Sequence, residues 1–192
     1  TDKLVLREAD GEGLVQRFLA DAARELGMWI VGGTLPLASD APERVRNTTL
    51  VYDPRGDRVA RYDKIHLFQF DNGREHYDEA RVIEAGRTPV QFDLPSRDGH
   101  RWRVGLSVCY DLRFPELYRA HASAGADLLL VPSAFTHTTG QAHWELLVRA
   151  RAVENLAYVV APAQGGVHAN GRHTWGHSML VDPWGTLLGQ QA

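Results

Sequence analysis

The sequence predicts an α/β protein whose sheet mixes parallel and antiparallel strands. Its 192 residues, 44% hydrophobic and 23% charged, suffice for the core of one globular domain. In the middle of the chain, apolar strand-like runs alternate with helical periodicity, which is typical of α/β layering. Asp-Pro-x-Gly turns at 53–56 and 182–185 each separate two strand-like runs, and so predict two antiparallel hairpins.

The individual elements follow from hydrophobic periodicity and from turn residues. Residues 14–26 have the spacing of an amphipathic helix, and Gly27 suits its end. Residues 28–31 predict a short buried strand that closes at Gly32 and Gly33. Further strands are expected at 47–52, 57–64, 102–108, 127–131, 156–161, 179–181 and 186–188, and further helices at 114–123 and 141–155.

Charge and composition exclude several classes of protein. The net charge of −3 provides no basic field to hold a nucleic-acid backbone. The apolar runs are too short to cross a bilayer, and a single cysteine excludes an internal disulfide and four-cysteine metal sites. We therefore expect a cytoplasmic protein with neither a nucleic-acid nor a membrane partner.

The only thiol, Cys109, is the first candidate for a catalytic residue. It follows a strand-like run and precedes a segment that becomes a helix near Pro115. Such corners lie at the ligand-binding edge of α/β sheets, and a nearby helix N-terminus favours the thiolate. Position alone favours an inert buried cysteine over a nucleophile. A nucleophile would need a base, for which His143 and His177 are candidates.

Lys64 lies at the end of a strand-like run, among aromatic and apolar residues. Its position alone favours a surface lysine with its stem along apolar surface over a desolvated functional charge. The loosely clustered His168, His173 and His177 do not match the His-Glu-x-x-His pattern of metalloprotease ligands. We expect these histidines to be exposed and hydrogen-bonded rather than to bind metal.

Four segments of the sequence resemble the nitrilase, or carbon–nitrogen hydrolase, superfamily. They are YDKIHLF at 62–68, VCYDLRFPE at 108–116, the helix at 143–155, and WGHSM with VDPWG at 175–185. They occur in the family's order over nearly the whole chain, and are most similar to the deaminated-glutathione amidase and omega-amidase branch. The resemblance implies a single domain over 1–192 with a four-layer α-β-β-α sandwich of mixed sheets, here incomplete at both ends.

The resemblance implies an amidase with a Glu-Lys-Cys triad and without metal or cofactor. Cys109 would attack the amide carbonyl and form a thioester with release of ammonia. Lys64 and the backbone N–H of Tyr110 would stabilise the oxyanion.

Two glutamates belong to the family's site, and only one is matched here. Glu79 would orient the lysine or the substrate, although Glu75 and Glu84 lie nearby in the sequence. The general-base glutamate belongs to a strand upstream of the region that matches 1–27, and Glu8 does not match its context. We therefore expect a truncated member or a part of a longer chain, with little turnover from these residues alone.

The resemblance also indicates the substrate and the assembly. Arg113 is a candidate clamp for a substrate carboxylate, with an ion pair to Asp111 or Glu116 as the alternative. Phe135 is expected at the mouth of the pocket or in the core. The expected substrate is a small carboxylate-bearing amide, such as an α-keto acid amide or deaminated glutathione. Two or more protomers are expected to associate through helices near Cys109.

Two other functions stay open. A different thiol hydrolase would pair Cys109 with a histidine base. An inactive member of the family would act as an interaction or assembly module, although the joint presence of Cys109, Lys64 and Glu79 speaks against that.

Overall fold

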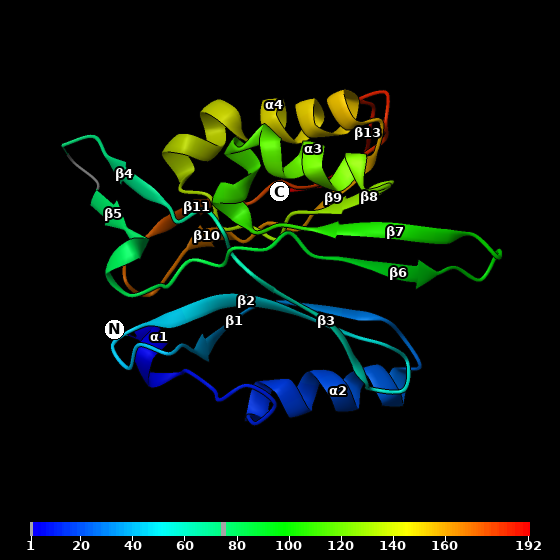
Figure 1. The fold of residues 1–192 in the computed structure, drawn as a ribbon. Helices are drawn as coiled ribbons and strands as arrows, with labels where there is room; N and C mark the ends of the chain where they lie inside the picture. The colour runs from blue at the N-terminus through cyan, green and yellow to red at the C-terminus, as the bar shows by residue number, and fades with distance from the viewer. Residues whose placement is uncertain (1, 74–75) are drawn as a thin grey trace. The chain divides into compact units, whose positions relative to one another are not determined.

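The computed structural model describes residues 2–73 and 76–192, which group into two compact units, one up to Val90 and one from Gln91. Each unit packs helices against a β-sheet, and this confirms the predicted α/β class (Figure 1). The α-helices are α1 (Asp2–Val5), α2 (Leu14–Leu26), α3 (Pro115–Ser123) and α4 (His137–Asn155), and the 3-10 helices are η1 (Glu79–Arg81) and η2 (Cys109–Arg113). The strands are β1 (Ile30–Ala38), β2 (Val45–Tyr52), β3 (Arg58–Asp63), β4 (Gln69–Asp71), β5 (His76–Asp78), β6 (Gln91–Pro95), β7 (Arg101–Leu106), β8 (Leu128–Leu130), β9 (Tyr158–Ala161), β10 (Gly165–Val167), β11 (His173–Trp175), β12 (Ser178–Val181) and β13 (Leu187–Gln191).

In the first unit, α2 covers one face of an antiparallel sheet with the strand order β1-β2-β3 (Figure 1). The helix buries Ala23 against Leu37 and Leu50 of the sheet. It begins and ends at the predicted residues. Gly27 closes it in the left-handed conformation, with φ +59°, as a C-terminal glycine commonly does.

The prediction that the first strand closes at Gly32 and Gly33 is wrong, because β1 continues to Ala38. A side chain at Gly32 would lie 2.4 Å from Leu19 Cδ1 of α2. Gly32 therefore lets the helix pack closely on the strand rather than ending it.

Both predicted hairpin turns are confirmed, and the aspartate organises each of them. Asp53 Oδ1 accepts the N–H groups of Arg55 and Asp57 at 2.9 and 3.0 Å, between β2 and β3. Asp182 Oδ1 likewise accepts the N–H groups of Trp184 and Thr186, between β12 and β13. Gly56 takes a φ of +80° that other residues rarely adopt.

The second unit contains a six-stranded mixed sheet of order β13-β12-β9-β8-β7-β6. β7, β8 and β9 are parallel, and their neighbours pair antiparallel, which confirms the predicted mixture. α3 and α4 lie side by side on one face of this sheet (Figure 1). α4 begins at His137, four residues before its predicted start, because Thr136 caps it by accepting the N–H of Thr139.

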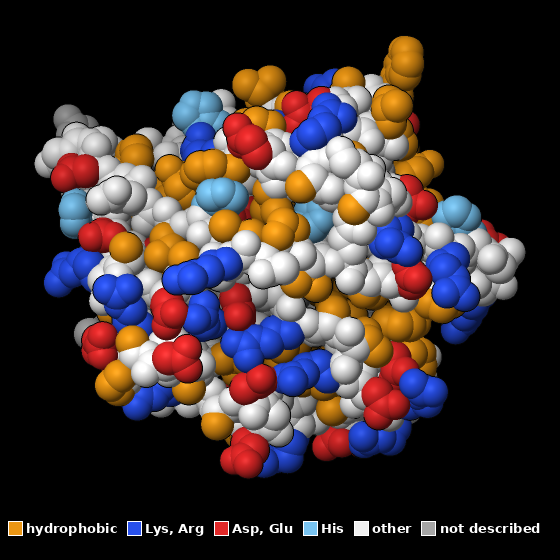
Figure 2. Space-filling view, in the orientation of Figure 1, with side chains coloured by type: hydrophobic (Ala, Val, Ile, Leu, Met, Phe, Trp, Pro, Cys, Tyr) orange, Lys and Arg blue, Asp and Glu red, His pale blue; other side chains and the backbone are white. Residues whose placement is uncertain are grey.

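Five of the described strands were not predicted: β6, which pairs with β7, and the strands of the short hairpins β4–β5 and β10–β11. No helix within residues 2–73 and 76–192 is long and apolar enough to cross a membrane. Lys and Arg side chains alternate with Asp and Glu over the face drawn in Figure 2, in keeping with the small net charge.

Candidate active site

Lys64 is buried, although its sequence position favoured the surface. It follows β3, where its N–H donates to Asn47 O at 2.9 Å and its carbonyl accepts from Gly86 N at 2.8 Å. Its side chain is 1% exposed, and Nζ lies 2.5 Å from Glu79 Oε2. A buried ammonium is costly unless it is paired. The surface interpretation is therefore wrong, and the Glu79 carboxylate compensates the charge.

Glu79 is held with its carboxylate toward Lys64. It opens η1, where the Asp78 carboxylate accepts the N–H of Ala80. Glu79 Oε2 accepts both the Lys64 ammonium, at 2.5 Å, and the N–H of Phe68, at 2.8 Å. The Glu79 N–H donates in turn to Phe68 O at 2.9 Å. The structure thus brings these two predicted site residues together and fixes the glutamate by both main chain and side chain.

The sequence neighbours of Glu79 are placed differently. Glu84 Oε1 pairs with Arg46 Nη2 at 2.5 Å, and Glu75 lies outside the described residues. Lys3 also approaches Glu79, with Nζ 3.9 Å from Oε1, but its side chain is 47% exposed. Among the described acids, Glu79 is therefore the one bonded to Lys64.

Cys109 lies three residues after the end of β7 and opens η2. Its φ of +53° belongs to the left-handed region, which residues other than glycine rarely occupy. Its N–H donates to Pro132 O at 3.0 Å, and Asp111 Oδ2 accepts the N–H of Val108 at 2.8 Å. α3 begins only at Pro115, so the half-buried thiol opens a 3-10 turn and not the α-helix. Strained backbone of this kind clusters at functional sites.

The residues predicted to bind substrate belong to the same unit as the thiol. Tyr110 follows it in η2 and packs its ring edge-on against Phe114, with centroids 5.5 Å apart. The Arg113 guanidinium lies over the rings of Tyr110 and Phe135, at 5.9 and 5.5 Å. Arg113 Nη2 is also 3.3 Å from His143 Nδ1. Phe135 is buried, so it backs the guanidinium rather than standing open to solvent.

The candidate histidine bases have other partners in the second unit. His143 contacts Arg113, as described. His177 stacks on Trp175 with centroids 4.1 Å apart, and its Nδ1 lies 2.9 Å from the Trp175 carbonyl. In the described part of the chain, no group of three His, Cys, Asp or Glu side chains could hold a metal ion.

A buried hydroxyl pair next to the cysteine turn was not predicted. Ser107 Oγ donates to Leu130 O at 2.8 Å, and Tyr118 donates its O–H to Ser107 Oγ at 2.7 Å. Burial raises the pKa of Tyr118 far above its usual range, so the phenol stays protonated and remains a donor. These bonds tie α3 to the end of β7 just before the thiol.

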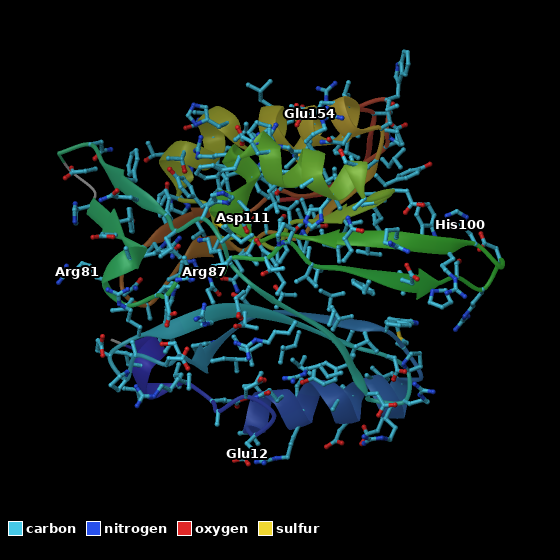
Figure 3. All side chains as sticks on the ribbon, in the orientation of Figure 1. Glu12, Arg81, Arg87, His100, Asp111 and Glu154 are labelled. Carbon is cyan, nitrogen blue, oxygen red and sulfur yellow. The ribbon has the colours of Figure 1, made fainter. Side chains whose placement is uncertain are left out.

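The burial of Arg151 close to the cysteine turn was also not predicted. The residue lies on the buried face of α4 with Trp144 and Val148, and its side chain is 6% exposed. Its Nη1 donates to Glu154 Oε1 at 2.8 Å, and Figure 3 labels Glu154 on α4. The sequence signal was a cation at the apolar i, i+4, i+7 spacing of that helix.

Comparisons with known proteins cover nearly the whole chain. A family model described as carbon-nitrogen hydrolase matches residues 3–192. The chain is 42% identical over 186 residues to the deaminated glutathione amidase of Yersinia enterocolitica, covering 95% of this chain and 63% of that protein. It is 40% identical over 171 residues to omega-amidase NIT2 of Homo sapiens, covering 88% and 59%.

A solved structure is similar as well. A mutant amidase from Nesterenkonia sp. AN1 matches with a TM-score of 0.76 at 32% identity, over 92% of this chain and 62% of that one. Its active-site cysteine carries the acetamide moiety of fluoroacetamide. The chain spans about three fifths of the length of the curated relatives that it matches.

Proposed function

The chain belongs to the carbon–nitrogen hydrolase family, and from this premise we propose that it carries the nucleophile of an amidase. The reaction is hydrolysis of a small carboxylate-bearing amide to a carboxylic acid and ammonia. The observation that carries the proposal is the buried Lys64 ammonium, 1% exposed and 2.5 Å from Glu79. A fixed, paired cation in a desolvated place suits the stabilisation of a developing oxyanion. The amidase names of the relatives support the same reaction.

In the first half-reaction, the Cys109 sulfur attacks the amide carbon, and the carbonyl electron pair moves to oxygen. The Lys64 ammonium and the Tyr110 N–H donate to that oxyanion. A lysine has three donor hydrogens, of which the bond to Glu79 uses one. The C–N bond then breaks, the thiol proton passes to nitrogen through a general base, and ammonia leaves a thioester on Cys109.

In the second half-reaction, water adds to the thioester. The same base takes the proton from water, the C–S bond breaks, and the carboxylic acid leaves as the thiol is restored. We assign this base to no residue of the chain. Glu8 has a different task, because its carboxylate accepts the N–H groups at the start of α2.

We assign the substrate carboxylate to Arg113. A guanidinium pairs with a carboxylate through two parallel bonds, and the rings of Tyr110 and Phe135 hold its plane. This arrangement favours an α-keto acid amide or deaminated glutathione over an uncharged amide. The amidase names of the relatives favour an amide over a nitrile.

Ammonia release from a panel of amides, by a protein that contains this chain together with the family's upstream general-base glutamate, tests the proposal against a cysteine–histidine mechanism. Lys64→Ala should remove nearly all turnover, while His143→Ala and His177→Ala should cause only modest losses. The opposite ranking would favour a histidine base. Release of no ammonia from any amide by the folded protein would favour the alternative of an inactive interaction or assembly module.

We further propose that the protein works in the cytoplasm as a homodimer or larger homo-oligomer, without metal or organic cofactor. Light scattering should give a mass of at least two chains of 21.4 kDa each. A monomer at micromolar concentration would contradict this part of the proposal.

A further inference from the structure

We infer that Arg151 is a positioning residue that holds the turn bearing Cys109 by binding one backbone carbonyl of that turn. The inference rests on the proposed role of Cys109 as the nucleophile. It concerns only the second unit, where α4 packs against α3 and against η2, the turn that bears Cys109.

The Arg151 guanidinium places two donors on a single acceptor. Its Nε and Nη2 lie 3.0 and 2.8 Å from Leu112 O, in a buried environment. Leu112 lies three residues after Cys109, within η2. The residues that follow Leu112 provide few backbone N–H donors for its carbonyl. Phe114 leaves the helical region with φ −111° and ψ +91°, and Pro115 has no N–H. Arg151 therefore supplies the hydrogen bonds that the turn would lack.

The same side chain is anchored on its other sides. Nη1 donates to Glu154 Oε1 at 2.8 Å, one turn further along α4. The guanidinium lies over the Tyr118 ring at 5.4 Å, and the Tyr118 hydroxyl binds Ser107. Arg151 thus touches the chain after the thiol directly, and reaches the chain before it through Tyr118. Figure 3 labels Asp111 in the turn and Glu154 on the helix.

Burial of a guanidinium removes its hydration, and the free-energy cost of this can exceed what its ion pairs contribute to stability. Well-packed apolar residues of similar volume often stabilise a protein as well as a buried ion pair does. The Arg151 side chain is 6% exposed, and two of its donors go to the turn and not to an acid. Cys109 has a φ of +53°, and such a conformation persists only where its surroundings enforce it. Control of the turn is therefore the role that matches these contacts.

Alkylation of Cys109 by iodoacetamide tests the inference without an amide substrate. Arg151→Lys keeps the charge but loses the two-donor fork, and Arg151→Met loses both. We expect Arg151→Lys to slow alkylation by about tenfold or more, because a loosened turn no longer presents the thiol as the native turn does. Arg149→Lys is the matched control, since Arg149 also donates Nε to a carbonyl, that of Gly185, away from the cysteine turn. The control should react within about twofold of the unchanged protein.

Amide hydrogen exchange separates positioning from general stability. The Phe114 N–H bonds Asp111 O within the turn, whereas the Ala126 N–H bonds His121 O outside it. Arg151→Lys should accelerate exchange at Phe114 by about tenfold and leave Ala126 unchanged. Alkylation at the unchanged rate, or equal acceleration at both amides, would overturn the inference.

Two further arms keep the test decisive. If Arg151→Met fails to fold, Arg151→Lys decides the question. Glu154→Gln keeps Arg151 but weakens the hydrogen bond that Arg151 Nη1 donates to residue 154. It should slow alkylation by a smaller factor than Arg151→Lys does. If Cys109 alkylates as expected but a protein that also carries the upstream general-base glutamate releases no ammonia, the result would count against the proposed function and leave the role of Arg151 standing.

Discussion

Lys64 and Glu79 form a pair whose two charges differ in exposure. The ammonium is 1% exposed and the carboxylate side chain 21%. Removal of either partner leaves the other charge unpaired. The free-energy cost is larger for a lysine without its acid, because the lysine is the more deeply buried charge. The pair therefore places the lysine where water is largely excluded and sets the carboxylate directly beside it.

Loss of the ammonium should remove one oxyanion donor. We predict that Lys64→Ala lowers kcat/KM for an amide by about a hundred- to a thousandfold. Glu79→Gln should also lower it, because the amide cannot balance the lysine charge. Glu84→Gln is the matched control, since Glu84 pairs with Arg46 instead. Steady-state ammonia release measures all three, and an equal loss in Glu84→Gln would contradict the assignment of Glu79.

Arg113 should govern substrate binding more than chemistry. We predict that Arg113→Lys raises KM for a carboxylate-bearing amide by about tenfold, because a lysine cannot form the two parallel bonds. KM for a neutral amide of the same size should change little. Arg119→Lys is the control, since the Arg119 side chain donates to the Glu154 carbonyl on α4. A uniform rise in KM for both amides would argue against a carboxylate clamp.

At the scale of elements, the start of α2 depends on a residue outside the helix. The N-cap is Gly13, which has no side chain, and Glu8 takes its place. Glu8 Oε1 accepts the N–H of Val15 at 2.6 Å, and Oε2 accepts that of Gln16 at 3.2 Å. Burial would raise the pKa of Glu8, but these hydrogen bonds outweigh it and hold the pKa below 4.5.

This cap predicts a pH-dependent contribution to stability. Because the folded state lowers the pKa of Glu8, the ionised cap is fully present above about pH 4.5 and is lost as the pH falls through the folded pKa. Glu8→Ala should lower the free energy of unfolding by about 1 kcal/mol near neutral pH, and by less in acid. Glu12→Ala, at the exposed glutamate labelled in Figure 3, should change it little. Urea unfolding measures both.

His121 of α3 is held as a neutral imidazole between one group that can only accept a hydrogen bond and one that can only donate. Its Nε2 donates to the Leu106 carbonyl at 2.9 Å, and its Nδ1 accepts from Gln91 Nε2 at 3.3 Å. A proton on Nδ1 would face the Gln91 donor. Burial lowers the pKa of His121 below 6.5, and the bond to Leu106 opposes this only in part.

The second unit should therefore lose stability in mild acid. Below about pH 6.5 the unfolded chain binds a proton that the folded His121 resists, so the free energy of unfolding falls as the pH drops from 6.5 through the folded pKa. One such proton contributes a slope of at most about 1.4 kcal/mol per pH unit. His121→Gln should flatten the slope between about pH 7.5 and 5.5. An unchanged slope in His121→Gln would refute the assignment.

At the scale of the whole molecule, the periodic and turn-bounded parts of the fold could be predicted from the sequence. The bounds of α2 and both hairpin turns follow from local rules, and the implied nitrilase-like fold is confirmed by similarity to the solved amidase. Gly32 was misjudged because its contact with Leu19 is tertiary. Burial of Lys64 was misjudged for the same reason, since local sequence does not reveal what covers a side chain. Glu79 required the family resemblance, because nothing in its own segment distinguishes it from Glu84.

The most direct test of the central claim is ammonia release from an α-keto acid amide by a protein that contains this chain together with the family's upstream general-base glutamate, measured beside Cys109→Ser. The account predicts release by the unchanged protein and only background release by Cys109→Ser, since the serine hydroxyl is a far weaker nucleophile than the thiolate. Acid quenching during turnover should also leave an acyl group on the peptide that contains Cys109. Undiminished release by folded Cys109→Ser would contradict the account.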